Sequence, residues 1–176
     1  MGKNGRPDNG GFSLVELIVV VLITAILSGG VATSVVILHD ADVTAASKKL
    51  VSMLTTARSY TVSKSGGTVW FEIAKEDGGG FYAYIYHGDK SAPDDADILS
   101  KEKLGGKSLT LDVTKEKDDG TQEITRLEDG QTVQFNFIKS SGALLEKYTD
   151  ITFSGGNDKS ENIIVINETG RCIRDI

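Results

Sequence analysis

The chain has 176 residues, of which 39% are hydrophobic and 25% are charged, values that fit one globular unit and exclude a disordered chain or a polytopic membrane protein. Its formal net charge of −6 disfavours a broad basic surface for nucleic acid. The single cysteine excludes an intramolecular disulfide, and with two histidines it makes a poor set of zinc ligands.

An apolar segment near the amino terminus follows a short polar leader. Residues 1–11 are glycine-rich, with Lys3 and Arg6 as their only basic residues. Residues 12–38 contain one ionisable side chain, Glu16, and as a helix they extend about 40 Å, enough to span a hydrocarbon core of roughly 30 Å. This run is too long for the apolar region of an ordinary secretory signal. The basic leader therefore predicts a single-pass membrane helix whose amino-terminal end stays in the cytoplasm.

Glu16 is the unusual residue of this apolar segment. An ionised carboxylate in hydrocarbon costs on the order of a few kcal/mol, so an acid there is a functional candidate that needs a cationic partner. Lys3 and Arg6 are candidates in the intact chain. A second interpretation places the carboxylate near the membrane interface, where it extends into water.

The residues around Glu16 form a specific motif. The string Gly11-Phe12-Ser13-Leu14-Val15-Glu16-Leu17 resembles the class III signal peptide of type IV pilins and type II secretion pseudopilins. The resemblance implies that a prepilin peptidase cleaves after Gly11 on the cytoplasmic side and methylates the new terminus, Phe12. It also implies that Glu16 pairs with the terminal amine of a neighbouring subunit, since pairing recovers part of the cost of burying both charges.

Beyond residue 38 the apolar pattern becomes amphipathic. Apolar residues recur near helical spacing with charged residues between them, which predicts that the helix continues over about 39–65. Gly66-Gly67 then favours the end of the helix. The predicted buried face consists of Val43, Ala46, Leu50, Met53, Leu54, Ala57 and Val62.

Later segments are rich in β-branched and aromatic residues and are bounded by turn residues such as Asp77-Gly78-Gly79-Gly80. Turns of this kind join antiparallel strands. The predicted strands are residues 69–74, 81–86, 108–113, 123–127, 132–138, 149–153 and 163–167. The expected fold is α+β, a long N-terminal helix packed on an antiparallel β-sheet in a head formed by residues 39–176, and the pilin resemblance implies the same fold.

Two further segments resemble minor pseudopilins of the GspH/FimT group. They are residues 50–69, with Ala57-Arg58 at their centre, and residues 163–171, which resemble the closing strand and Gly-Arg turn of that group. Major pilins usually carry a helix-kinking proline where this chain has Ser28-Gly29-Gly30, and many close a carboxy-terminal loop with a disulfide. The resemblance therefore favours a minor subunit, held in the cytoplasmic membrane and assembled with other pilins or pseudopilins into a cell-surface filament.

The resemblance leaves two alternatives open. Type IV pili, type II secretion and DNA uptake share this leader and helix, so the sequence does not choose among them. The competing interpretation is a single-pass, membrane-anchored binding protein that is never polymerised, for which Glu16 is incidental.

The other motifs offer little chemistry. The acidic clusters 94–97 and 118–120 lack the spacing of an EF-hand, so solvated loops are favoured over calcium sites. No nucleophile or metal-binding pair accompanies His39 or His87, and no enzyme activity and no cofactor are expected.

Arginine and tyrosine residues of the head have competing interpretations. Arg171 and Arg174 provide too few phosphate contacts for strong binding of nucleic acid, so pairing with acids such as Asp175 is favoured. The tyrosines of segment 81–86 share one strand face. Strand packing is favoured for them over a surface stripe that binds a ligand.

Overall fold

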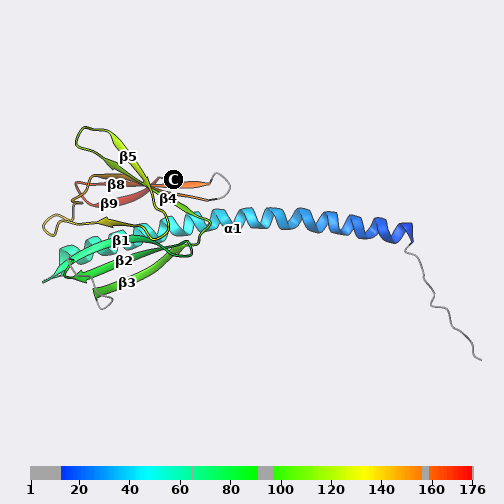
Figure 1. The fold of residues 1–176 in the computed structure, drawn as a ribbon, viewed down its shortest axis with the longest axis horizontal. Helices are drawn as coiled ribbons and strands as arrows, with labels where there is room; N and C mark the ends of the chain where they lie inside the picture. The colour runs from blue at the N-terminus through cyan, green and yellow to red at the C-terminus, as the bar shows by residue number, and fades with distance from the viewer. Residues whose placement is uncertain (1–12, 65, 91–96, 156–158, 176) are drawn as a thin grey trace, which may run out of the picture. The chain divides into compact units, whose positions relative to one another are not determined.

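The computed structural model describes residues 13–64, 66–90, 97–155 and 159–175, and for residues 27–41 it describes the backbone alone. In this part of the chain, one helix precedes nine strands. The chain forms two compact units, Met1–Ile37 and Leu38–Ile176. The elements, labelled in Figure 1, are α1 (Leu14–Ser63), β1 (Thr68–Glu76), β2 (Gly80–Gly88), β3 (Ile98–Gly105), β4 (Thr110–Glu116), β5 (Gln122–Arg126), β6 (Thr132–Phe135), β7 (Tyr148–Ser154), β8 (Ser160–Ile166) and β9 (Arg171–Asp175).

Hydrogen bonds at each end define the bounds of α1. At its start, Ser13 accepts two backbone N–H groups, that of Leu17 on its carbonyl oxygen at 3.1 Å and that of Glu16 on Oγ at 3.3 Å. Ser13 is therefore the N-cap residue. Past Ser63, the φ angles of Gly66 and Gly67 are 81° and 66°, left-handed values that glycine adopts after a helix end.

The second unit buries one face of α1. Six of the seven predicted residues on that face are buried, from Val43 to Ala57, but Val62 is 50% exposed, so its predicted burial is wrong. Thr61, which lies four residues after Ala57 and continues the same helical row, is buried in its place at 6% exposure. Its hydroxyl donates to the carbonyl oxygen of Ala57 at 2.9 Å, which satisfies the buried polar group.

The strands form two antiparallel sheets. One has the order β3-β2-β1-β6 and the other the order β5-β4-β7-β8-β9, as can be followed in Figure 1. The α+β class with a helix packed on antiparallel strands is confirmed, although the strands divide between two sheets. The division arises because β6 returns to pair with β1, whereas β4 pairs with β7.

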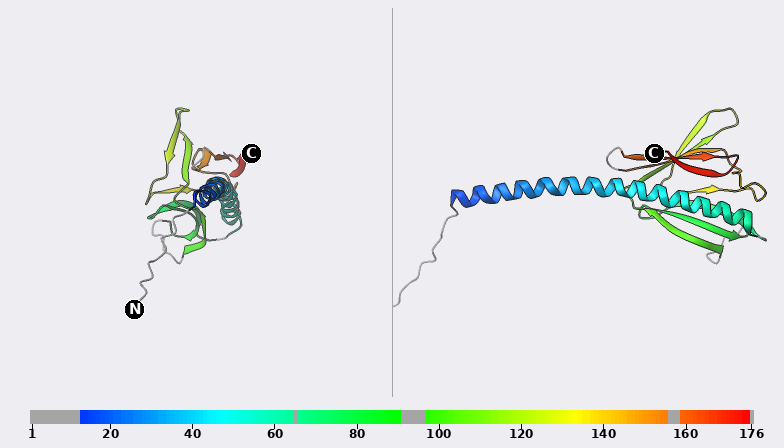
Figure 2. Two further views of the ribbon diagram at one scale, coloured as in Figure 1. Left: turned by 90° about the vertical axis from the view of Figure 1, so that its right-hand side faces the viewer. Right: turned by 180° about the vertical axis from the view of Figure 1, so that it is seen from behind.

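Both sheets share one hydrophobic core with the helix, and Figure 2 shows them on different sides of its second half. Phe81 of β2 meets Phe153 of β7 edge to face, with ring centroids 6.2 Å apart. Phe135 of β6 lies 4.5 Å from the ring of Tyr148. Full burial of each such side chain contributes about 1.5–3 kcal/mol, so these contacts fasten the sheets to each other.

The sequence did not predict β3 and β9, and both are edge strands. β3 carries the run Lys101-Glu102-Lys103, and β9 begins and ends with charged residues. Charged side chains protect sheet edges from pairing with other chains, and they also weaken the apolar pattern by which strands are predicted.

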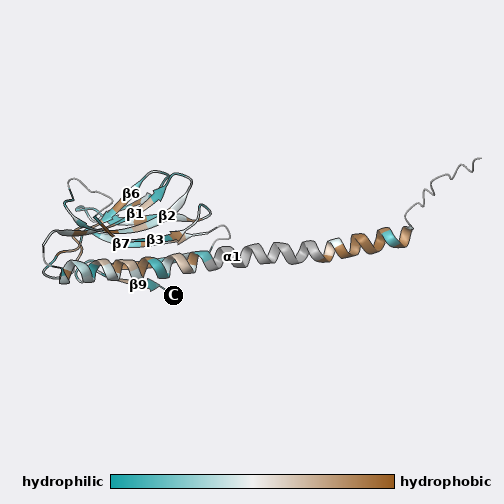
Figure 3. Ribbon diagram, turned by 90° about the horizontal axis from the view of Figure 1, so that it is seen from below, coloured by the Kyte–Doolittle hydropathy of each residue, from teal (hydrophilic) through white to brown (hydrophobic). Residues whose placement is uncertain are grey.

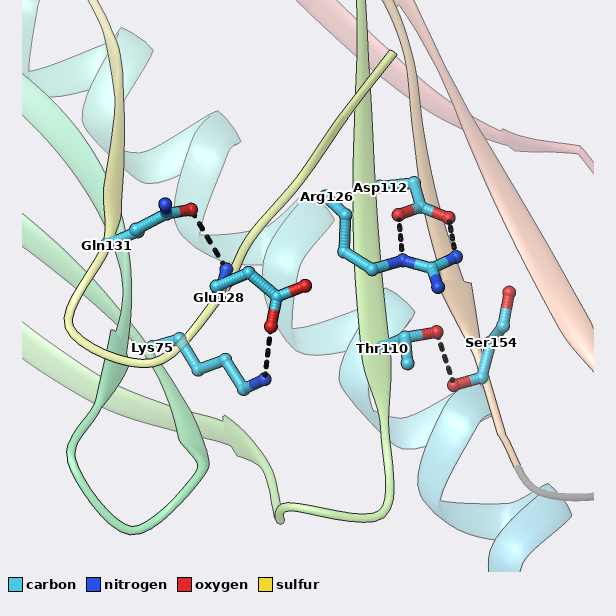
Figure 4. A network of polar contacts seen from close by, with 7 residues as sticks. All are labelled: Lys75, Thr110, Asp112, Arg126, Glu128, Gln131 and Ser154. Carbon is cyan, nitrogen blue, oxygen red and sulfur yellow. Dashed lines mark hydrogen bonds and ion pairs between the residues drawn. The ribbon is translucent and has the colours of Figure 1, made fainter.

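Ion pairs reinforce the strand pairs at the surface, as Figure 4 shows. The guanidinium of Arg126 on β5 donates two hydrogen bonds of 2.8 Å to the carboxylate of Asp112 on β4. Beyond β5, Glu128 lies 4.0 Å from the Lys75 ammonium of β1, and its backbone N–H donates to the Gln131 side chain. Because these pairs are partly exposed to solvent, each adds little to the stability of the head.

Candidate functional site

The predicted processing site precedes the described helix. Gly11 and Phe12 lie outside the described residues, as do Lys3 and Arg6. Glu16 lies exposed in the first turn of α1, where a carboxylate interacts favourably with the helix dipole.

The structure brings Ser13 and Glu16 together through the cap hydrogen bond. This contact was not predicted from the sequence. Its signal is the spacing of a serine three residues before a glutamate, which is typical of a capping box at a helix start.

Apolar side chains surround the start of α1 on every side. From Leu14 to Ile26 the large apolar side chains are 48–76% exposed, and the first turns are coloured hydrophobic in Figure 3. Leu17, Val21 and Leu22 line part of a shallow apolar groove along this stretch. A helix that is apolar all round needs other apolar groups to cover it.

A helix long and apolar enough to cross a bilayer is not found among the residues that the structure describes. The predicted spanning helix over residues 12–38 is not confirmed. Residue 12, and the side chains of residues 27–38, lie outside the description.

Arg58 joins the two head segments that carry the GspH/FimT resemblance. Its Nε–H group is shared between two carbonyl oxygens, that of Thr169 at 2.7 Å and that of Gly142 at 3.2 Å. Gly170 lies so close that a Cβ there would be 1.9 Å from the Gly142 oxygen. One side chain of α1 thus holds the turn before β9 and the loop after β6.

The contact of Arg58 with the loop that contains Gly142 was not predicted from the sequence. The loop is positioned by a backbone hydrogen bond of 2.9 Å from Leu144 to the carbonyl oxygen of Asn167. The φ angles of Gly142 and Gly170 are 72° and 62°. A glycine in each tight turn was the available sequence signal, since these φ values are strained for other residues.

A partly buried ion pair provides a second attachment of α1 to the head. Arg174 of β9 donates to the carboxylate of Glu161 at 2.7 Å and 3.1 Å, and Thr44 of α1 donates to the other oxygen at 2.6 Å. The Arg174 and Glu161 side chains are 20% and 10% exposed. Burial raises the pKa of Glu161, but hydrogen bonds from Thr44 and Arg174 outweigh it and hold the pKa below its ordinary value. Arg174 therefore pairs with an acid, which is Glu161.

The tyrosines of β2 form a stack within the sheet surface. The ring of Tyr86 lies between Trp70, at 5.0 Å, and Tyr84, at 5.7 Å. Lys101 of β3 covers Tyr84, and Glu76 accepts hydrogen bonds from both residues. Because neighbouring rings and lysine occupy these ring faces, the geometry supports the predicted strand packing over a ligand platform.

The remaining candidates show no convergent chemistry. Asp118 pairs with Lys147 at 3.3 Å, and the Asp119 carboxylate accepts two hydrogen bonds from Thr121. Within the described ranges no group of three His, Cys, Asp or Glu residues is placed to hold a metal ion. The acidic residues 94–96 and the His39 side chain lie outside the description.

Burial raises the pKa of the half-buried Cys172 thiol to about 12, which keeps the thiol protonated.

Comparison with known proteins gives one match. Residues 6–32 match the family model described as the prokaryotic N-terminal methylation motif. No curated protein and no solved structure matches the chain. The motif supports the resemblance to the pilin-like superfamily, and it implies processing by a prepilin peptidase, membrane anchoring and assembly with other pilins.

Proposed function

We propose that the chain is a minor pilin or pseudopilin subunit of a type IV pilus or of a type II secretion-like filament. A prepilin peptidase cleaves it after Gly11 and methylates Phe12. The observation that carries this proposal is the methylation motif over residues 6–32, which runs into a helix with apolar side chains on all sides.

The exposed apolar helix supports storage in the cytoplasmic membrane followed by polymerisation. Covering one large aliphatic side chain contributes about 1.5–3 kcal/mol when burial is complete. Consecutive residues from Leu17 to Ile23 are all exposed and point to every side of the helix. Full burial of these side chains therefore requires lipid, or a bundle of similar helices, all around the helix. A pilin meets lipid before assembly and neighbouring helices after it, and we propose residues 12–38 as the membrane-spanning and filament-core segment.

Glu16 is the proposed assembly residue. It lies exposed on the helix close to the terminus that cleavage would create. A carboxylate there pairs with the Phe12 amine of a neighbouring subunit, and this contact fixes the register between helices. A contact between unlike surfaces that does not close into a ring continues as a filament.

The head supports assignment to the GspH/FimT group. Arg58 and the turn that contains Gly170 belong to the two segments that resemble this group, and they lie in contact in the head. We propose a structural role for this head in the filament. Nucleic acid is not proposed as its ligand, because Glu161 holds Arg174.

The first test is the mass of the amino-terminal peptide after expression with and without a prepilin peptidase. A chain that begins at methylated Phe12 only with the peptidase supports the proposal. Retention of residues 1–11 in both hosts contradicts it and favours the alternative, a membrane-anchored binding protein that does not polymerise.

The second test measures incorporation of Glu16→Ala into filaments. The variant should be processed and anchored but excluded from the filament, whereas Glu168→Ala, which removes an exposed carboxylate of the head, should be incorporated normally. Normal incorporation of Glu16→Ala would show that the pairing mechanism is wrong.

A further inference from the structure

Three polar side chains from separate parts of the head lie in contact at the end of β6. Lys90 follows β2, Asn136 follows β6 and Glu146 precedes β7. The Nζ atom of Lys90 lies 2.5 Å from Oδ1 of Asn136. The carboxylate of Glu146 accepts hydrogen bonds from Nδ2 of Asn136 and, at 3.0 Å, from the backbone N–H of the same residue. An amine nitrogen thus lies next to an amide group, with a carboxylate at the amide nitrogen.

The contact lies beside a buried aromatic ring. The register of β1 with β6, continued by one residue, places Asn136 next to Trp70. On its other side Trp70 pairs with Tyr86 of β2, and the two rings stack 5.0 Å apart. Trp70 is 1% exposed, and Asn136 and Glu146 are partly buried. Packing of this kind restricts the orientation of the amide, and two groups held in a fixed orientation react faster than free ones.

We propose that Lys90 and Asn136 form an isopeptide bond within the chain, with Glu146 as the proton carrier. The Lys90 ammonium first loses one proton to water, because only the neutral amine is a nucleophile. Nζ then adds to Cγ of Asn136, and a second proton passes from Nζ through Glu146 to Nδ2. The bond between Cγ and Nδ2 breaks and ammonia leaves. The new amide joins Nζ to Cγ, and no atom is oxidised or reduced.

This bond joins the ends of β2 and β6 across β1, which lies between them in the sheet. The two residues are 46 positions apart in the chain, and a cross-link that closes a long loop limits the conformations of the unfolded chain. The single cysteine cannot provide such a cross-link within the chain. The inference goes beyond the proposed function and does not depend on it, because neither cleavage of the leader nor polymerisation enters the reaction.

The test uses the full chain in detergent, incubated at about pH 7 and at about pH 9. Digestion with a protease should give one branched peptide that joins the segments around Lys90 and Asn136. Its mass should equal the sum of the two segments less one ammonia. The peptide should accumulate at least about ten-fold faster at the higher pH, because more of the amine is neutral there. The branched peptide is the readout, since cyclisation at Asn4-Gly5 or Asn9-Gly10 also releases ammonia.

Three variants separate the roles of the residues. Lys90→Arg keeps the positive charge but removes the amine, so it should give no branched peptide. Glu146→Gln keeps the shape but removes the proton carrier, so it should slow formation of the bond by at least about ten-fold. Lys139→Arg, at another exposed lysine of the head, is the matched control and should leave the rate unchanged. The fluorescence of the buried Trp70 shows whether each variant is folded.

Absence of the branched peptide from the folded natural chain at both pH values would overturn the inference and leave Lys90 as a hydrogen-bond donor alone. A branched peptide that joins Asn136 to a different lysine would overturn it as well. A bond that forms equally fast in folded Glu146→Gln would contradict the role of Glu146.

Discussion

Removing the donor group of Arg58 tests how α1 is held to the head. Arg58→Met keeps an unbranched apolar stem but removes the N–H that Thr169 and Gly142 share. A hydrogen bond from a charged donor contributes about 1.5–3 kcal/mol, and here one N–H serves two acceptors. Because Arg58 is only half-buried, we expect the free energy of unfolding to fall by about 2 kcal/mol.

Trp70 provides the assay. It is the only tryptophan and lies buried in the head, so its fluorescence reports unfolding of the head in the detergent-solubilised full chain. A loss of about 2 kcal/mol lowers the Tm of a domain of this size by roughly 6 °C. Arg171→Met, at an exposed arginine, is the matched control and should change the Tm little. If the free energy of unfolding of Arg58→Met lies within about 0.5 kcal/mol of that of the natural chain, the hydrogen bonds of Arg58 do not hold the helix to the head.

Three further predictions concern the head. Gly170→Ala should destabilise it by more than the roughly 1–2 kcal/mol of positive-φ strain expected for Gly120→Ala, because only the Cβ at Gly170 meets a backbone oxygen; equal unfolding midpoints in denaturant would contradict the close contact. The lowered pKa of Glu161 stabilises the folded state above its unfolded value of 4.5, and this stabilisation is lost as the pH falls through the folded pKa; Glu161→Gln should therefore flatten the stability curve measured below about pH 5. With its pKa near 12, Cys172 should react with iodoacetamide at pH 8 at least about ten-fold more slowly in the folded chain than in urea, and equal rates would show the thiol to be accessible.

Periodicity predicted most of the elements because burial sorts residues by face. Six of the seven apolar positions assigned to the buried face of α1 are buried. The seventh, Val62, fails because apolar character alone does not distinguish it from Thr61, which lies on the correct helical row and satisfies its own hydroxyl. The edge strand β3 was missed because its charged residues remove the apolar alternation.

The contacts that hold the head together were less accessible to sequence reasoning. Arg58 was marked by the GspH/FimT resemblance, but its partners are backbone carbonyls 84 and 111 residues away. Every residue type carries such a carbonyl, so composition gives no signal for it. Thr44 and Glu161 are likewise separated by 117 residues. The Ser13 cap is the opposite case, since its three-residue spacing is local and readable.

The two units give a last prediction, on Glu16. The head has its own core, and Glu16 belongs to the other compact unit, where its side chain is exposed. Glu16→Ala should therefore leave the Trp70 unfolding curve within about 0.5 kcal/mol of the natural chain, while filament incorporation is lost. Arg58→Met should instead lower the Tm of the head and leave cleavage of the leader unchanged. If Glu16→Ala lowered the stability of the head as well, its absence from filaments would be explained by misfolding, and the assignment of Glu16 to assembly would lose its support.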